Sequence, residues 1–121
     1  MAEFTLQLLH ATDQEGAAPA LVNAPNLSAV LNALEDDYDN TLILSSGDLW
    51  LPGLFYSASA EVYGFTNEDG EFEGVPGIAD ILINSALGFD AVAFGNHEFD
   101  QGTGAIAALL EANPDITGPG L

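Results

Sequence analysis

The chain contains no lysine and no arginine, whereas it has 19 aspartate and glutamate residues and a formal net charge of −19. It therefore lacks the positive side chains that bind nucleic-acid backbones and anionic membrane surfaces. We expect no nucleic acid polymer and no membrane among its partners. Any chemistry on phosphate would have to take its positive charge from bound metal ions. For most of the carboxylates a simpler explanation holds, namely a solvated acidic surface that keeps the protein soluble.

Cysteine is also absent, which excludes disulfides and thiolate metal ligands and leaves the redox compartment open. The sequence has no apolar run of the roughly 20 residues that a membrane-spanning helix needs. No signal peptide is visible, because the N-terminus has no basic region and Glu3 and Gln7 interrupt its apolar stretch. The 121 residues fit one domain, and a hydrophobic content of 48% indicates a globular chain with its own core.

Three strand-like segments alternate with three helix-like ones. Strands are predicted at residues 4–9, 41–44 and 90–94. The first helix is predicted from apolar residues at i, i+3, i+4 and i+7, with Asn26 as its N-cap after Pro25. The apolar positions of this first helix are Leu27, Val30, Leu31 and Leu34. A second helix is predicted from Ile78, Ile81 and Leu82, with a stop at Gly88. A third is predicted from Ile106, Leu109 and Leu110, with an end at Pro114. Residues 49–75 show no sustained period, so we expect an irregular loop there.

This alternation predicts an α/β fold in which parallel strands are joined by right-handed helical crossovers. Two of the strands are nearly continuous apolar runs, as expected when both faces of a sheet are covered. Ligands of such sheets bind beyond the carboxyl ends of the strands. All three predicted strands end in a polar cluster, so the clusters are expected to meet at one edge.

The residue types in these clusters suit metal-dependent chemistry. The clusters contain His10, Asp13 and Glu15; Asp48; and Asn96, His97, Glu98 and Asp100. Carboxylate and amide oxygens suit hard divalent cations, and imidazole suits zinc, iron or nickel. A carboxylate such as Asp48 can bridge two cations about 4 Å apart, as two-metal phosphatases require. His97 could protonate a leaving alkoxide while Asp100 orients the imidazole.

Each of these residues also has an ordinary structural explanation. A single aspartate after a strand is more often a turn or cap residue. His10 is more typical of a packing or supporting histidine, and Glu98 is as compatible with a structural role as with a catalytic one. Trp50 and Phe99 are more typical of a core than of a substrate platform. The order of three such clusters at three strand ends is what favours a site.

Three motifs carry a resemblance to a known family. The runs are Leu-Leu-His-Ala-Thr-Asp at 8–13, Ser-Ser-Gly-Asp at 45–48 and Phe-Gly-Asn-His-Glu-Phe-Asp at 94–100. They resemble the calcineurin-like metallophosphoesterases, and within them the 5′-nucleotidase branch, from residue 5 to about residue 112. The resemblance implies that residues 1–121 are part of a catalytic domain with a four-layer α/β/β/α fold and two divalent metal ions.

The resemblance also implies roles for individual residues. Asp13 would bind the first metal, Asp48 would bridge both, and Asn96 would bind the second. His97 and Asp100 would form the catalytic pair. The chain departs from the family at Glu15, where most members have histidine. A carboxylate there could still bind metal, and it would favour Mn, Mg or Ca over Zn.

In the family, further metal-binding histidines and a base-binding domain lie downstream. We therefore expect this chain to be an N-terminal fragment that lacks its C-terminal part, with a degenerate relative as the alternative. A sheet of three strands would leave an edge unpaired, which favours the fragment. Such a fragment is expected to be inactive by itself. The family also suggests a periplasmic or extracellular location.

Two functions follow as hypotheses. The first is a metal-dependent hydrolase of phosphate monoesters, with nucleotides favoured and cyclic diesters or other monoesters left open. The second is a non-enzymatic acidic module that binds cations or forms a surface. Residues 67–71 weakly resemble a calcium loop but lack the ligand pattern of an EF-hand. The run Asn96-His97-Glu98 with Asp100 favours the enzyme, because a calcium module has no need for it.

Overall fold

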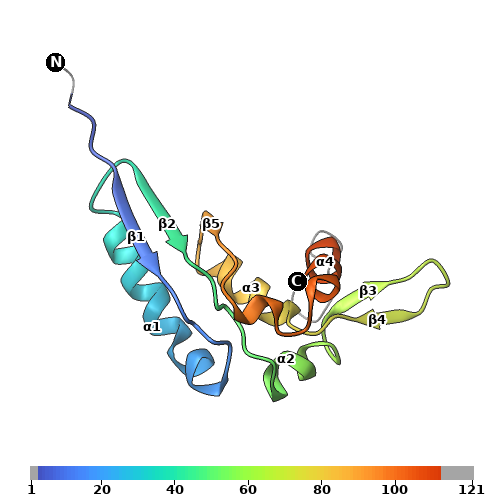
Figure 1. The fold of residues 1–121 in the computed structure, drawn as a ribbon. Helices are drawn as coiled ribbons and strands as arrows, with labels where there is room; N and C mark the ends of the chain where they lie inside the picture. Colours follow the sequence, from blue (N-terminus) through green and yellow to red (C-terminus); the bar gives the residue numbers. More distant parts are fainter. Residues whose placement is uncertain (1–2, 113–121) are drawn as a thin grey trace.

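The computed structural model describes residues 3–112 and shows a mixed α/β fold (Figure 1). Its elements are β1 (Gln7–Ala11), α1 (Ala18–Glu35), β2 (Thr41–Ser45), α2 (Leu54–Ser59), β3 (Gly64–Thr66), β4 (Phe72–Gly74), α3 (Ile78–Ala86), β5 (Ala91–Val92), the 3-10 helix η1 (His97–Phe99) and α4 (Thr103–Ala112). None of the helices in this range is long and apolar enough to cross a membrane.

The parallel sheet has the strand order β1-β2-β5, and β2 is central. β1 pairs with β2 from Gln7 opposite Thr41 to Ala11 opposite Ser45. β5 adds only two residues to the other edge of β2, where Leu44 lies opposite Ala91. The prediction of parallel strands joined by helical crossovers is therefore confirmed. All three strands point the same way, so the loops that follow them leave from one edge of the sheet.

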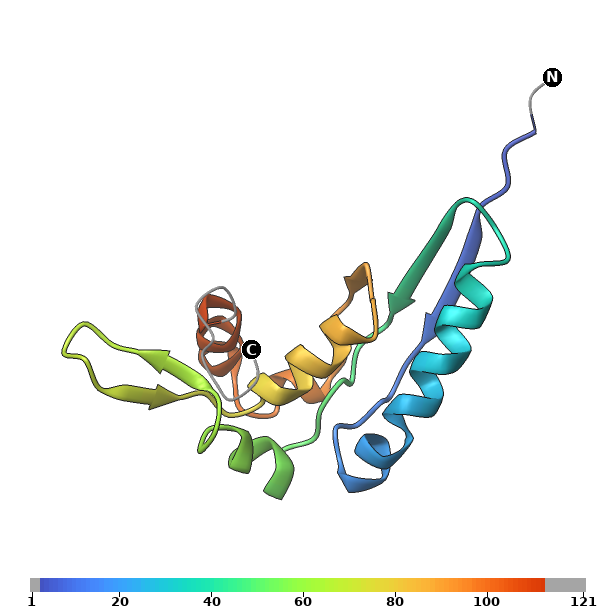
Figure 2. The ribbon, with the colours of Figure 1, turned by 180° about the vertical axis from the view of Figure 1, so that it is seen from behind.

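Helices α1 and α3 cover the same face of the sheet, as Figure 2 shows from behind. Leu31 of α1, Ile43 of β2 and Leu87 just after α3 are buried together there. Strand residues alternate between faces, so Leu9 joins this cluster while its neighbours Leu8 and His10 do not. The helices thus fix β1 and β2 from behind and leave the carboxyl ends of the strands open.

The opposite face of the sheet is uncovered within residues 3–112. Leu8 and Leu42, which lie side by side in the register, are 59% and 38% exposed. The expectation that both faces are covered is therefore wrong for this part of the chain. The apolar character of the strands is nevertheless that of a sheet meant to be buried on both sides.

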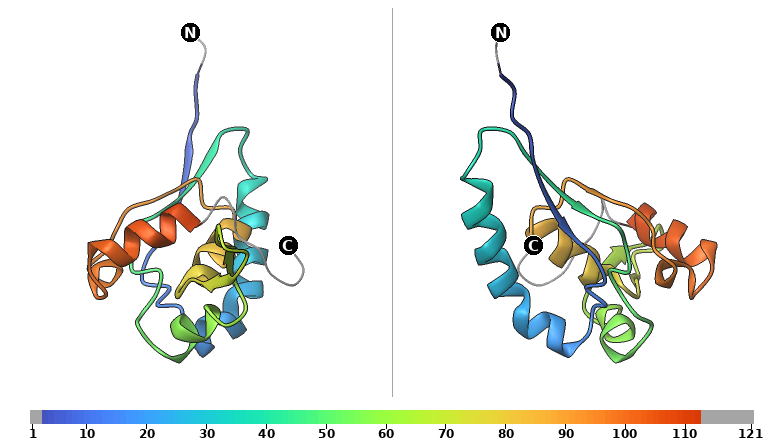
Figure 3. Two further views of the ribbon diagram at one scale, coloured as in Figure 1. Left: turned by 90° about the vertical axis from the view of Figure 1, so that its right-hand side faces the viewer. Right: turned by 60° about the vertical axis from the view of Figure 1, so that its left-hand side comes forward.

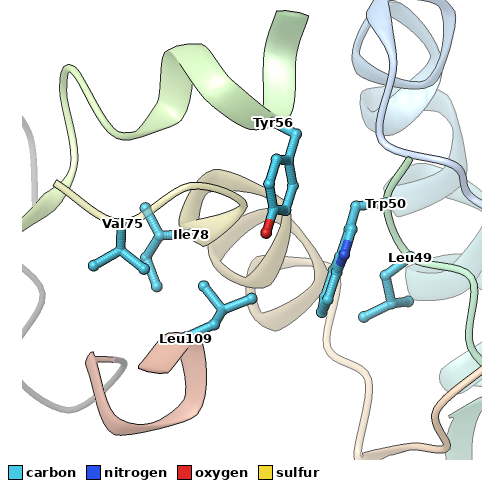
Figure 4. Packing of buried hydrophobic residues seen from close by; sticks show 6 residues of the cluster. All are labelled: Leu49, Trp50, Tyr56, Val75, Ile78 and Leu109. Atoms are coloured by element: carbon cyan, nitrogen blue, oxygen red, sulfur yellow. The ribbon is translucent and has the colours of Figure 1, made fainter. Parts of the chain in front are cut away.

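The expected irregular loop at residues 49–75 contains a helix and a hairpin. α2 lies in its middle, and β3 and β4 pair in antiparallel fashion and project away from the parallel sheet (Figure 1). Much of the segment is core: Trp50 is 3% exposed and packs with Tyr56, Val75 and Ile78 (Figure 4). Trp50 is a core residue, as expected. The segment escapes a periodicity search because its elements are short.

Several element boundaries differ from the predictions. β1 runs two residues further than predicted and includes His10, which therefore lies inside the strand on its exposed face. α1 begins at Ala18, so Asn26 is not its N-cap and Pro25 lies inside the helix. β5 is shorter than residues 90–94. α3, the turn at Gly88 and α4 agree with the predictions, whereas the expected stop at Pro114 lies outside the described residues.

Candidate functional site

The loops after β1 and β2 are joined by backbone hydrogen bonds. The amide of Asp13 donates to the carbonyl of Gly47 at 3.2 Å, and that of Glu15 donates to Asp48 at 3.0 Å. The amide of Gly16 donates to Leu49 at 2.9 Å. The pairing of the two strands thus continues into the two loops. Asp13, Glu15 and Asp48, which are distant in sequence, are held on adjacent backbone segments.

The backbone is strained at the same three positions. Asp13, Glu15 and Asp48 have φ values of 53°, 50° and 54°, and within residues 3–112 they are the non-glycine residues with positive φ. Residues with a side chain rarely adopt this left-handed conformation, which costs on the order of 1–3 kcal/mol each. Such strain persists where the surroundings enforce it, and it concentrates at active sites and ligand clamps. The three predicted carboxylate ligands therefore share a left-handed backbone conformation, which is uncommon above all for a glutamate.

The third loop, after β5, packs directly against the second. The backbone amide of His97 donates to Oδ1 of Asp48 at 2.9 Å. Gly47 and Gly95 allow this approach: a side chain on Gly47 would overlap the backbone of Gly95, and one on Gly95 would overlap the Asp48 carboxylate. The glycines before Asp48 and Asn96 are therefore required by close packing.

The buried side chain of Glu98 binds the backbone of both of these loops. Its carboxylate, 2% exposed, accepts the backbone amides of Asp48 at 2.9 Å, Leu49 at 2.8 Å and Gly95 at 2.6 Å. Three N–H donors occupy most of the lone pairs of this buried carboxylate and stabilise it without a cationic partner. The sequence alone is compatible with either a structural or a catalytic role for Glu98. Its contacts in the structure are those of a residue that holds two loops together.

The Asp13 carboxylate is oriented by hydroxyl groups. The Thr12 hydroxyl donates to Oδ2 of Asp13 at 2.6 Å, and the Ser46 hydroxyl donates to the Thr12 oxygen at 2.8 Å. This chain again links the first loop to the second. It leaves Oδ1 of Asp13 free of hydrogen bonds within the described part of the chain, as Oδ2 of Asp48 also is.

His97 and Asp100 form a pair on η1. Nδ1 of His97 lies 2.7 Å from Oδ2 of Asp100, across one turn. This hydrogen bond raises the pKa of His97, and although partial desolvation opposes the rise, the charges of Asp100, Asp48 and Glu15 add to it. Because Nδ1 is engaged, Nε2 is the nitrogen left to act on a ligand. The arrangement favours the protonated imidazole over the neutral one, and the protonated form is the one that a general acid requires.

Asp100→Asn should lower the pKa of His97 in the metal-free protein, because the amide cannot stabilise the imidazolium as a carboxylate does. Titration of the His97 ring protons by NMR measures the change directly. Glu68→Gln is the control, since it also removes one negative charge but lies on the exposed hairpin turn. An unchanged His97 pKa in Asp100→Asn would show that the pair does not exist in solution.

The predicted metal ligand Asn96 lies at the surface. Asn96 is exposed, lies between Gly95 and His97 beside the Asp48 loop, and its side chain does not cap η1. Within residues 3–112 no group of three or more His, Asp or Glu side chains is arranged to hold a metal ion. The structure thus brings the loops of the predicted ligands together without a complete ligand set.

Phe99, expected to be core, is half exposed and packs edge-to-face on Phe94 with ring centroids 6.0 Å apart.

Comparison with known proteins gives one informative similarity. The chain is 26% identical over 114 residues to the trifunctional nucleotide phosphoesterase protein YfkN of Bacillus subtilis (strain 168). The aligned region covers 94% of this chain but only 6% of that relative's length. No protein-family model matches the chain, and no solved structure matches it.

Proposed function

We propose that the protein containing this chain is a metal-dependent phosphoesterase that hydrolyses phosphate monoesters, with nucleotides as the favoured substrates. The observation that carries the proposal is the left-handed backbone at Asp13, Glu15 and Asp48, the three carboxylates predicted as ligands. The paired loops and the His97–Asp100 pair stand at the same edge of the sheet. The similarity to a nucleotide phosphoesterase supports the substrate class.

The donor set suits two hard divalent cations, Mn, Mg or Ca before Zn. Asp13, Glu15, Asp48 and the Asn96 amide would hold them, with Asp48 between the two. The free carboxylate oxygens of Asp13 and Asp48 fit this assignment. When bound, such ions supply the positive charge that phosphate oxygens need, which a chain without lysine or arginine cannot provide.

The chain's own residues would position the ester and move the proton. Nε2 of His97 would donate its proton to the leaving oxygen, since Nδ1 is held by Asp100. The raised His97 pKa keeps that proton available. Glu98 would act only by fixing the loops that carry Asp48 and His97.

The remaining ligands would come from a further part of the same protein, packed against the uncovered sheet face in a four-layer α/β/β/α domain. Leu8 and Leu42 provide the apolar surface for such a second sheet. The small share of the relative's length that this chain spans agrees with a longer protein. The isolated 121-residue chain should then be nearly inactive.

A paired substitution tests the roles in the full-length protein. His97→Ala should reduce the rate of phosphate release by about 100-fold or more while leaving the metal content nearly unchanged, because its role is protonation. Asp48→Ala should lose both metal and activity, because its role is bridging. Elemental analysis and phosphate release from a nucleoside monophosphate measure the two effects on each variant.

The reverse pattern, in which His97→Ala loses the metal and Asp48→Ala keeps it, would overturn the assignment of roles. The alternative function, an acidic cation-binding module, is distinguished by the same data: cations would bind, but no variant or wild-type protein would release phosphate. The calcium-loop resemblance at residues 67–71 carries little weight, because Oδ1 of Asn67 already accepts the amides of Asp69 and Glu71 within the hairpin turn.

A further inference from the structure

Two hydroxyl side chains, those of Thr12 and Ser46, meet just beyond the carboxyl ends of β1 and β2. The two strands run side by side in both views of Figure 3, and their register ends with Ala11 opposite Ser45. Thr12 and Ser46 are the next pair in that register. The backbone amide of Ser46 donates to the carbonyl of Ala11 at 3.3 Å, so the two chains stay joined beyond the last strand pair. The continued pairing therefore holds the two hydroxyl groups together.

The hydroxyl groups form a chain whose direction is fixed by its last acceptor. An ionised carboxylate can only accept, so the Thr12 hydroxyl gives its one proton to Oδ2 of Asp13, at 2.6 Å. The Thr12 oxygen then remains as an acceptor, and the Ser46 hydroxyl donates to it at 2.8 Å. The shorter of these distances is typical of a hydrogen bond to a charged oxygen, which is stronger than one between neutral groups. Oδ2 of Asp13 is thus engaged, whereas Oδ1 accepts no hydrogen bond within residues 3–112.

Asp48 presents its carboxylate in the same way. Its Oδ1 accepts the backbone amide of His97 at 2.9 Å, and its Oδ2 accepts no hydrogen bond in the described part of the chain. Each of these two carboxylates therefore offers one free oxygen to a cation. Ca²⁺ has a flexible coordination geometry and often takes both oxygens of a carboxylate, whereas Mg²⁺ demands a near-ideal octahedron, a geometry that Mn²⁺ also adopts. Carboxylates with one oxygen engaged suit the octahedral ions better.

We propose that Thr12 and Ser46 are positioning residues for Asp13, and that they favour Mg²⁺ or Mn²⁺ over Ca²⁺ at the first metal position. The inference rests on the proposed function, since it takes Asp13 as a metal ligand. The Asp13 side chain is exposed, so the Thr12 hydroxyl is what holds its carboxylate in one orientation. Groups that hydrogen-bond a ligating carboxylate typically contribute about 10–100-fold to metal affinity.

Thr12→Val in the full-length protein removes the hydroxyl and keeps the shape of the side chain. It should weaken Mn²⁺ binding by about tenfold, because the carboxylate is no longer held in its binding orientation. It should change Ca²⁺ binding by less than about twofold, because a rotating carboxylate with both oxygens free still serves that ion. Calorimetric titrations with MnCl₂ and with CaCl₂ measure both affinities in the absence of substrate.

Two further variants separate the hydroxyl from the rest of the side chain. Thr12→Ser keeps the hydroxyl group and should retain the preference for Mn²⁺ over Ca²⁺. Thr66→Val makes the same change as Thr12→Val on the exposed strand β3 of the hairpin, and both affinities should stay at their wild-type values. Urea denaturation of each variant shows that it is folded.

Ser46 acts through Thr12, and a double variant tests this order. Ser46→Ala alone should weaken Mn²⁺ binding by about threefold, the effect of one ordinary hydrogen bond. Combined with Thr12→Val it should cost no more than Thr12→Val alone, because the Ser46 hydroxyl has already lost its acceptor. Additive losses would show that the two hydroxyl groups act separately, against the proposed chain.

The side chain of Asp13 can also be observed in the metal-free protein. Its Hα–Hβ couplings in NMR should report one rotamer in the wild type and an average over rotamers in Thr12→Val. Averaged couplings in the wild type would overturn the inference without any variant. So would equal losses of Mn²⁺ and Ca²⁺ affinity in Thr12→Val, or no loss of either, and in these cases wild-type Mn²⁺ binding and phosphate release would leave the proposed function standing. A wild-type protein that neither binds Mn²⁺ nor releases phosphate would refute the proposed function and this inference with it.

Discussion

Glu98→Ala should lower the free energy of unfolding by about 3–5 kcal/mol, which is a large effect for the loss of one buried carboxylate. The substitution leaves three backbone amides, those of Asp48, Leu49 and Gly95, buried or half-buried without an acceptor. It also opens a void where a fully buried side chain stood. Urea denaturation followed by tryptophan fluorescence measures the change, since Trp50 lies next to Leu49 in the core.

Glu98→Gln is the matched variant. The amide keeps the shape and one acceptor oxygen, which can replace Oε2 and serve Asp48 and Gly95. Its NH₂ group would then face the Leu49 amide, donor against donor. We expect a loss of about 1–2 kcal/mol, intermediate between wild type and alanine. Equal stability of all three proteins would show that Glu98 does not hold the loops, and the site would need another explanation for its backbone strain.

The fold could be predicted from the sequence where a local pattern is long or strongly apolar. The run 41–44 gave β2, and the spacing of Ile78, Ile81 and Leu82 gave α3. α1 was predicted too late because Pro25 and Asn26 are typical of a helix start, whereas Pro25 lies inside this helix. Ala18, Ala20 and Ala24 are strong helix formers but leave no mark in a search for large apolar side chains. Pro19 at the helix start was the available signal.

The hairpin was missed for a different reason. Its strands have three residues each, and its turn runs through Asn67, Asp69 and Gly70. Asp-Gly between two β-rich segments is a turn signal. The same residues weakly resemble a calcium loop in sequence, because Glu68, Asp69 and Glu71 are carboxylates. In the structure Asn67 bonds the turn's own backbone.

The position of the candidate residues at one edge of the sheet could be predicted from the sequence, but the backbone geometry there could not. Three polar clusters after three parallel strands place Asp13, Asp48 and His97 at one edge by topology alone. The left-handed φ values arise from hydrogen bonds between loops more than thirty residues apart, which no local pattern contains. Glu98 and Asp80 likewise reveal their roles only through burial. For Asp80 the signal in the sequence was a carboxylate between Ile78 and Ile81, in the apolar first half of its helix.

Asp80 should make the protein less stable as pH rises from about 4 to 7. Burial raises the pKa of Asp80 from 3.8 to about 7, while its own backbone N–H opposes the rise slightly. In the unfolded chain the group ionises near its ordinary pKa, so between these two values the folded state binds more protons. Stability must then fall with rising pH across this window and level off above it. The loss is about 4 kcal/mol, because the two pKa values differ by about 3 and each pKa unit corresponds to about 1.4 kcal/mol.

The comparison with Asp80→Asn isolates this effect from the other 18 carboxylates, which titrate alike in both proteins. The two proteins should be about equally stable near pH 4, and the variant should be more stable at pH 8 by about 4 kcal/mol. Urea denaturation at intervals from pH 4 to 8 gives the difference curve. Glu68→Gln, which removes an exposed charge, should give a nearly flat curve instead. A flat curve for Asp80→Asn as well would mean that water or a partner group reaches Asp80 in solution.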